Sequence, residues 1–134
     1  MLTIGRVAAE TGLRASAIRY YEAQGLLPKP SRTAGRRIYD SSILERLAVI
    51  ELAKAAGFRL NEIRAMLSDI GANQPAAAWR TLTSAKNVEI DQQMKRLLLM
   101  KHILARLKAC RCATLDECGR AFIAGRARRR SRAF

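Results

Sequence analysis

The feature that most constrains the fold is a long segment without glycine or proline, from residue 79 to about residue 109. Within this segment apolar residues recur at spacings of 4, 3, 3, 4 and 3: Ile90, Met94, Leu97, Met100, Leu104 and Leu107. Such spacing is typical of one face of a helix that packs along a partner. A helix of about 32 residues extends for about 48 Å, more than the width of so small a domain. The stripe therefore predicts a dimerisation helix, paired as an antiparallel coiled coil in a homodimer; a helix of a single-chain bundle is the alternative.

The first 25 residues carry the boundaries of two short helices. Thr3 can cap the first helix, and Gly12 can stop it. Ser16 can cap or open the second helix, which Gly25 ends. Two short helices around a tight turn form a helix-turn-helix pattern.

Residues 28–39, P-K-P-S-R-T-A-G-R-R-I-Y, follow as a basic segment whose prolines exclude helix. Its A-G pair suits a tight turn between short extended arms, which predicts a β-wing. Helical periodicity resumes at about residue 41, is closed by Gly57, and returns from Leu60 to Gly71. We therefore expect a mostly α chain: a winged-helix domain over 1–71, a hinge (72–78) and dimerisation helix over 72–109, a cysteine loop over 110–120, and a disordered basic tail over 121–134.

The net charge of +14 favours a polyanionic partner such as nucleic acid. Residues 119–134 hold six basic and no acidic side chains, so much of the excess lies in a short tail that could serve solubility alone. No apolar run approaches the roughly 20 residues that span a bilayer. The first residues do not resemble a secretory signal. We expect a cytoplasmic protein with no membrane partner.

All three cysteines lie within the segment A-C-R-C-A-T-L-D-E-C, as Cys110, Cys112 and Cys118. Three cysteines cannot pair off within one chain. In a reducing compartment, closely spaced cysteines are more often metal or redox ligands than structural disulfides. We therefore regard the segment as a candidate effector site, with inert buried cysteines as the alternative.

Two kinds of chemistry remain open for these thiols. A soft ion such as Cu(I) or Hg(II) suits three thiolates, and Zn(II) would need a fourth ligand from Asp116, Glu117 or water. Cofactor-free redox chemistry is the other, because nearby cationic side chains favour thiolate over thiol. These side chains are Arg106, Lys108, Arg111 and Arg120.

The chain resembles the MerR family of winged-helix transcription regulators. The matching segments are I-G-R-V-A-A-E-T-G-L (4–13), A-I-R-Y-Y-E-A-Q-G-L-L (17–27), G-R-R-I-Y (35–39) and A-G-F-R-L-N-E-I (56–63). The resemblance implies a homodimer on a pseudo-palindromic promoter, whose effector-bound form bends and untwists the DNA. RNA polymerase would then be engaged indirectly, through the DNA.

The residues that we expect to contact DNA lie on the second helix and the wing: Ser16, Arg19, Tyr20, Tyr21, Arg32, Arg36, Arg37 and Tyr39. We expect Arg19 and Tyr21 on the exposed side of the helix. Tyr20 could face the DNA or the core. Tyr39 is expected to pack or hydrogen-bond beside the wing arginines. Ser16 stands where the family often has a lysine, so its contact would be weaker.

From Trp79 onward the chain resembles the redox-sensing SoxR branch, whose four cysteines, spaced C-x2-C-x-C-x5-C, hold a [2Fe-2S] cluster. The three cysteines of this chain fall on the last three positions, and Leu107 occupies the first. A [2Fe-2S] cluster usually has four protein ligands, so it is the alternative to a soft metal ion here. Cys110 and Cys118 are separated by seven residues, similar to the loop of the family's copper(I) sensors.

Other positions offer no further ligand. Divalent-metal members of the family place a cysteine near the start of the dimerisation helix, where this chain reads P-A-A-A over 75–78. The only histidine, His102, lies about 12 Å along the helix from Cys110. The sequence thus predicts a DNA-binding regulator, not an enzyme, that senses a soft metal or redox signal. A small thiol metallochaperone or redox carrier is the alternative of another class.

Overall fold

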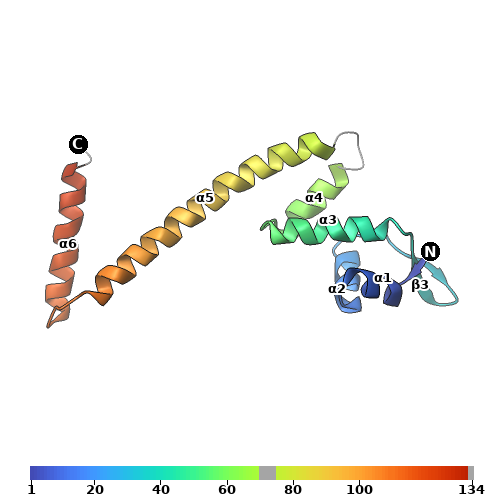
Figure 1. The fold of residues 1–134 in the computed structure, drawn as a ribbon, viewed down its shortest axis with the longest axis horizontal. Coiled ribbons are helices and arrows are strands. Elements are labelled where there is room, and N and C mark those ends of the chain that lie inside the picture. The colour runs from blue at the N-terminus through green and yellow to red at the C-terminus, as the bar shows by residue number, and fades with distance from the viewer. Residues whose placement is uncertain (70–74, 133–134) are drawn as a thin grey trace. The chain divides into compact units, whose positions relative to one another are not determined.

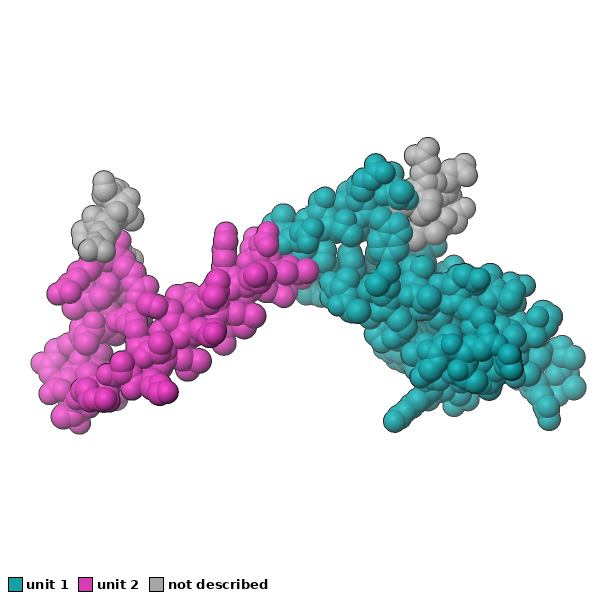
Figure 2. All heavy atoms as spheres, viewed as in Figure 1, with its two compact units in different colours: residues 1–88 teal, residues 89–134 magenta. Residues whose placement is uncertain are grey.

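A computed structural model of the chain describes residues 1–69 and 75–132, and it is mostly helical, as the sequence predicts. The elements, shown in Figure 1, are β1 (Leu2–Thr3), α1 (Ile4–Thr11), α2 (Ala15–Ala23), β2 (Ser31–Thr33), β3 (Arg36–Tyr39), α3 (Ile43–Ala55), α4 (Leu60–Asp69), α5 (Pro75–Lys108) and α6 (Leu115–Arg132). The chain divides into two compact units, residues 1–88 and residues 89–134 (Figure 2). Unit 1 is the candidate DNA-reading unit, and unit 2 carries the cysteines.

The helix-turn-helix consists of α1 and α2. The Thr3 hydroxyl oxygen accepts a hydrogen bond from the Arg6 backbone N–H at 3.3 Å, and Gly12 ends α1 with a φ of 72°. Both predicted boundaries are confirmed. The predicted cap at Ser16 is wrong, because α2 already begins at Ala15 and Arg14 precedes it in an extended conformation. Ser16 is instead an exposed residue of the first turn.

The predicted wing is a hairpin of β2 and β3, in which Thr33 pairs with Arg36. Ala34 and Gly35 both have positive φ, 49° and 75°, as a tight two-residue hairpin turn requires. The sequence analysis missed the short strand β1, which adds to the other side of β3 and gives the antiparallel order β1-β3-β2. The wing is thereby attached to the start of α1.

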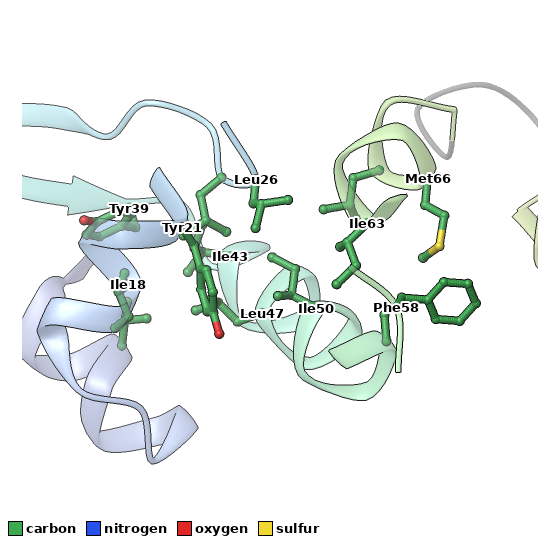
Figure 3. Close-up of a cluster of buried hydrophobic side chains, with 14 residues drawn as sticks. Ile18, Tyr21, Leu26, Tyr39, Ile43, Leu47, Ile50, Phe58, Ile63 and Met66 are labelled. Carbon is green, nitrogen blue, oxygen red and sulfur yellow. The ribbon is translucent and has the colours of Figure 1, made fainter. Parts of the chain in front are cut away.

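The core of unit 1 lies between α2, α3 and α4 and the base of the wing (Figure 3). Ile18 of α2, Leu47 and Ile50 of α3 and Ile63 of α4 have no accessible surface. Trp79 and Leu82, on the first turns of α5, pack against the same core. The start of α5 therefore belongs to unit 1.

Helix α5 begins earlier than the sequence analysis expected. The predicted hinge covered residues 72–78; residues 72–74 lie outside the described part of the chain, and Pro75 to Ala78 are helical. Proline is tolerated in the first turn, where its missing N–H has no helical partner, and alanine favours helix. The helix of 34 residues extends for about 51 Å.

The basic segment expected to be disordered is helical as far as Arg132, within α6. Thr114 accepts a hydrogen bond from the Glu117 backbone N–H at 3.3 Å, and Glu117 Oε2 accepts one from the Ala113 backbone N–H at 3.0 Å. This reciprocal pair is close to a capping box, which the run T-L-D-E encodes. The alanines and arginines that follow are good helix formers, which explains the difference. No helix among the described residues is long and apolar enough to cross a lipid bilayer.

Candidate functional site

The first candidate site is the exposed surface of α2 and the wing. Arg19 and Tyr20 are exposed on α2, and Arg32 and Arg36 are exposed on the two strands of the wing. Cationic and aromatic side chains on a recognition helix and a wing are suited to phosphates and base edges. Both elements belong to one unit with a common core, which fixes their positions relative to each other.

The exposure of the two adjacent tyrosines of α2 differs from the sequence prediction. Tyr21, expected on the exposed side, is only 3% exposed, whereas Tyr20 is 49% exposed. The Tyr21 hydroxyl donates a hydrogen bond to Glu51 Oε1 at 2.7 Å and accepts one from Lys54. Burial raises the pKa of Tyr21. Tyr21 therefore fastens α2 to α3, and Tyr20 is the aromatic side chain available at the surface.

Glu22 links α2 to the wing, a role that the sequence analysis missed. The Tyr39 hydroxyl donates to Glu22 Oε2 at 2.9 Å, and Arg37 Nε donates to Glu22 Oε1 at 3.4 Å. Burial, together with the hydrogen bond to Glu22, raises the pKa of Tyr39 to about 12. Tyr39 is 2% exposed, so it packs and hydrogen-bonds beside Arg37 as expected, but its burial does not fit the direct DNA contact that the sequence analysis also expected of it. Arg37 and Tyr39 thus hold the wing beside α2.

Lys86 is a second residue that the sequence did not single out. It lies on α5 and is only 7% exposed, with its Nζ 3.0 Å from Glu62 Oε2 of α4 and 5.0 Å from the centre of the Phe58 ring. The hydrogen bond from Lys86 lowers the pKa of Glu62. A lone lysine in a helical sequence gives no signal of such a contact, because only the fold brings α4 and α5 together.

The second candidate site is the cysteine cluster of unit 2. The Sγ atoms of Cys110, Cys112 and Cys118 all lie within 4.8 Å of one another, and those of Cys110 and Cys118 are 3.9 Å apart. Cys110 and Cys112 lie in the loop after α5, whereas Cys118 lies on α6. The predicted convergence of the three thiols is therefore present in the structure.

The thiols influence one another's protonation. The Cys112 backbone N–H donates to Cys110 Sγ at 3.4 Å, which lowers the pKa of Cys110. The side-chain hydrogen bond to Cys110 raises the pKa of Cys112 to about 11. The two shifts are opposite in direction, so Cys110 loses its proton more readily than Cys112. A bound cation would favour the thiolate form of both, because metal ligation displaces thiol protons.

The donor set fits a soft metal ion. Three sulfur ligands whose atoms lie within 4.8 Å can converge on one ion, and thiolates select soft metals. Of the described residues, only the three cysteines form such a cluster. Neither Asp116 nor Glu117, the predicted fourth ligands of Zn(II), takes part in it. A cavity of about 550 Å³ adjoins the thiols, and Leu107 lies in its wall.

Comparisons with known proteins agree with this architecture. The family model described as MerR HTH family regulatory protein matches residues 2–70, and the model described as MerR, DNA binding matches residues 44–107. A SoxR homolog from Chromobacterium violaceum, an HTH-type transcriptional activator, is 31% identical and covers 87% of this chain and 80% of its own length. The HTH-type transcriptional regulator CueR from Yersinia pestis is 35% identical and covers 81% of each chain.

A solved structure resembles the chain over nearly its whole length. The transcription regulator PbrR691 from Ralstonia metallidurans CH34, crystallised in complex with lead(II), has a TM-score of 0.73 and 31% identity. The match covers 89% of this chain and 95% of that one. These relatives are transcription regulators, and the two family models together match the helix-turn-helix, the wing and α5. The chain therefore belongs to the MerR family of DNA-binding transcription regulators.

Proposed function

We propose that this regulator binds a soft metal ion at Cys110, Cys112 and Cys118 and changes transcription in response. The observation that carries the proposal is the convergence of three thiol sulfurs within 4.8 Å, attached through α5 to a DNA-reading unit. Similar proteins include CueR, a mercuric resistance regulator and a ZntR homolog, as well as the lead(II) complex of PbrR691. A small thiol carrier, the alternative from the sequence, has no need of a helix-turn-helix and a wing.

We assign DNA binding to the exposed residues of α2 and the wing, with promoter DNA containing a pseudo-palindromic operator as the partner. Arg19, Tyr20, Arg32 and Arg36 would make the contacts, and Ser16 a weaker one. Tyr21, Arg37 and Tyr39 would act by holding α2 and the wing in place, through Glu51, Lys54 and Glu22. RNA polymerase would respond indirectly, because DNA deformation changes how its recognition elements are presented.

We further propose a homodimer through α5. The six residues of the apolar stripe are between 36% and 62% exposed within one chain. Exposed apolar surface of this extent on one helix is typical of a protein interface. A dimer would also place two DNA-reading units on one operator, which matches the two-fold symmetry of a palindrome.

The cysteine loop is placed to bias the shape of such a dimer. Cys110 follows the last residue of α5 by two positions, and Cys118 lies on α6, so the donors come from the loop after α5 and from α6. A bound soft ion would cross-link the three thiolates. The chain's own contribution is to hold the donors close together and to connect them through α5 to the DNA-reading unit. An ion that binds one dimer shape more tightly than another shifts the population towards it.

The test is the double variant Cys110→Ser/Cys118→Ser, with promoter affinity and metal-dependent transcription both measured. We expect operator affinity within about twofold of wild type, since the thiols lie outside unit 1, and complete loss of the metal response. Protein purified without oxygen is analysed for metal in parallel. A collapse of operator affinity in the variant would show that the cysteines are structural and would overturn the proposal.

A redox sensor is the second candidate, favoured by the similarity to a SoxR homolog and by the 3.9 Å separation of two thiol sulfurs. A [2Fe-2S] cluster would need a fourth ligand beyond the three cysteines. A cofactor-free sensor would need only the thiols. Iron and sulfide in equal amounts in the purified protein would favour the cluster, and a response to oxidant in metal-free protein would favour the thiols.

A further inference from the structure

We propose that Leu107 is the specificity-determining residue of the thiol site and restricts it to ions that are satisfied by three thiolates. Lead(II) is the probe of this class, and Zn(II) is the ion that the site disfavours. The inference rests on the proposed function, because it assumes that a soft ion binds the cluster. Beyond the proposed function, the inference specifies which metal ions the three cysteines accept and names Leu107 as the residue that determines this selectivity.

Leu107 adjoins the three thiols and carries no donor atom. It lies in the wall of the cavity that all three cysteines also line. It is one helical turn before Cys110, whose backbone N–H donates to the Leu107 carbonyl at 3.2 Å. Residue 107 and Cys110 therefore belong to the same hydrogen-bonded turn at the end of α5. Leucine offers no lone pair to a metal ion.

No other described side chain supplies the missing donor. The cluster of histidine, cysteine and carboxylate ligands comprises the three cysteines only. Glu117 is the nearest carboxylate in sequence to Cys118, but its Oε2 accepts the Ala113 N–H at 3.0 Å as part of the cap of α6. Recruiting Glu117 as a ligand would break this cap, at a cost of about 1 kcal/mol.

The apolar part of the cavity wall adds no donor atom. Beside Leu107 it is formed by Leu99, Ile103 and Phe122. None of these side chains carries a lone pair that a metal ion could use. The wall next to the thiols therefore supplies no fourth protein ligand.

The charge of the surroundings favours a three-thiolate complex. Three thiolates and one divalent ion carry a net charge of −1. The same cavity is lined by Arg106, Arg126 and Arg129, whose cationic groups would stabilise that charge. Zn(II) is almost always four-coordinate in structural sites, whereas lead(II) is soft and stable with three thiolates on one side of the ion.

The test compares lead(II) and Zn(II) binding to the reduced full chain and to Leu107→Cys. Lead(II) is followed by its sulfur-to-metal absorption, and Zn(II) by competition with a chromophoric chelator. We expect wild type to bind one lead(II) per chain and to retain it against excess Zn(II). In Leu107→Cys, Zn(II) affinity should rise by at least about tenfold, because a fourth thiolate completes the tetrahedron.

Leu104→Cys is the matched control. Leu104 and Leu107 belong to the same apolar stripe and are similarly exposed, 62% and 59%, but Leu104 does not line the cavity. Its substitution should leave Zn(II) affinity unchanged. Equal gains in the two variants would show that any added thiol suffices and would overturn the role of Leu107.

The wild-type measurement stands even if a variant fails to fold. Zn(II) displacing lead(II) at equal concentration in wild type would show that a fourth ligand is available and would overturn the inference. Binding of Cu(I) without lead(II) would overturn the inference but leave the proposed function standing. Failure of lead(II), Zn(II) and Cu(I) alike to bind wild type would instead overturn the proposed function. The two failures are therefore distinguishable.

Discussion

Unit 1 and unit 2 differ in how far their apolar side chains are buried. Among the described residues, unit 1 buries fourteen apolar side chains in one core, which α1, α2, α3, α4 and β3 and the loops between them supply, and the first turns of α5 pack against it. In unit 2 no described side chain is buried, although Leu97, Leu98, Leu99 and Met100 stand in a row on α5. Both units are largely helical, so helix content does not explain the contrast.

The difference shows where each unit obtains its stability. Unit 1 has a core that a single chain can complete. Unit 2 consists of the second part of α5, a loop and α6, and these two helical segments bury none of their described apolar side chains. Its exposed stripe and its thiol cluster are both features that a second component would complete: a second chain for the stripe and an ion for the thiols.

The largest expected effect is in the core of unit 1. Ile50→Ala should lower the free energy of unfolding by about 3 kcal/mol, because it removes a fully buried side chain. Urea denaturation followed by the fluorescence of Trp79, the only tryptophan, measures this. Leu52→Ala, on the same helix but 68% exposed, should change it by less than about 0.5 kcal/mol. Equal effects would mean that the core of unit 1 is not where its stability lies.

The next effect tests whether unit 2 depends on a second chain. Leu97→Glu should raise the dissociation constant of the dimer by about 100-fold, because each interface would bury two uncompensated charges. Light scattering coupled to size-exclusion chromatography measures the mass. Gln92→Glu adds the same charge on another face of α5 and should leave the dimer intact. A wild-type chain that is monomeric at micromolar concentration would contradict the conclusion that a second chain covers the exposed stripe of unit 2.

The smallest effect concerns the contact between α4 and the start of α5 within unit 1. Lys86→Met should lower the free energy of unfolding by about 1 kcal/mol at pH 7, since it removes the partner of the Glu62 carboxylate. Lys86 lowers the pKa of Glu62, so this stabilisation is present above the ordinary pKa of 4.5 and is lost as the pH falls below it.

The difference between wild type and Lys86→Met should therefore shrink in urea denaturations carried out at decreasing pH. Lys95→Met, an exposed lysine further along α5, is the control and should have little effect at any pH. A difference that persists unchanged at pH 3 would assign the effect to packing on Phe58 rather than to the ion pair.

Local signals predicted most of the fold. The cap at Thr3, the stop at Gly12 and the A-G turn of the wing depend on neighbouring residues only, and all three are present. The burial of Tyr21 and the exposure of Tyr20 could not be predicted. Adjacent residues are separated by only 100° around the helix axis, and Glu51 and Lys54, which Tyr21 contacts, are about 30 residues away in the sequence. The helix over 115–132 was missed because six arginines outweighed the capping signal T-L-D-E in the prediction.

The cysteine site also has features that the sequence predicts and features that only the structure shows. The composition of the cysteine segment alone indicated thiol chemistry, and the position of Leu107 was noted from its spacing. That Leu107 shares a cavity with the three cysteines, and that Glu117 is engaged by Ala113, follows from the loop folding back between α5 and α6. Spacing along a chain cannot give this, since a loop of a few residues can direct its side chains in many ways.

The sequence by itself determined the helix-turn-helix, the wing, the long helix, the family and the three clustered cysteines, because these depend on residue type and local spacing. The tertiary structure decided which tyrosine reaches the surface, how the wing is fastened through Glu22, and what surrounds the thiols. The physical reason is that burial and hydrogen bonding across distant segments are properties of the packed chain. They exist only when α2, α3 and the wing, or α5 and α6, have been brought together.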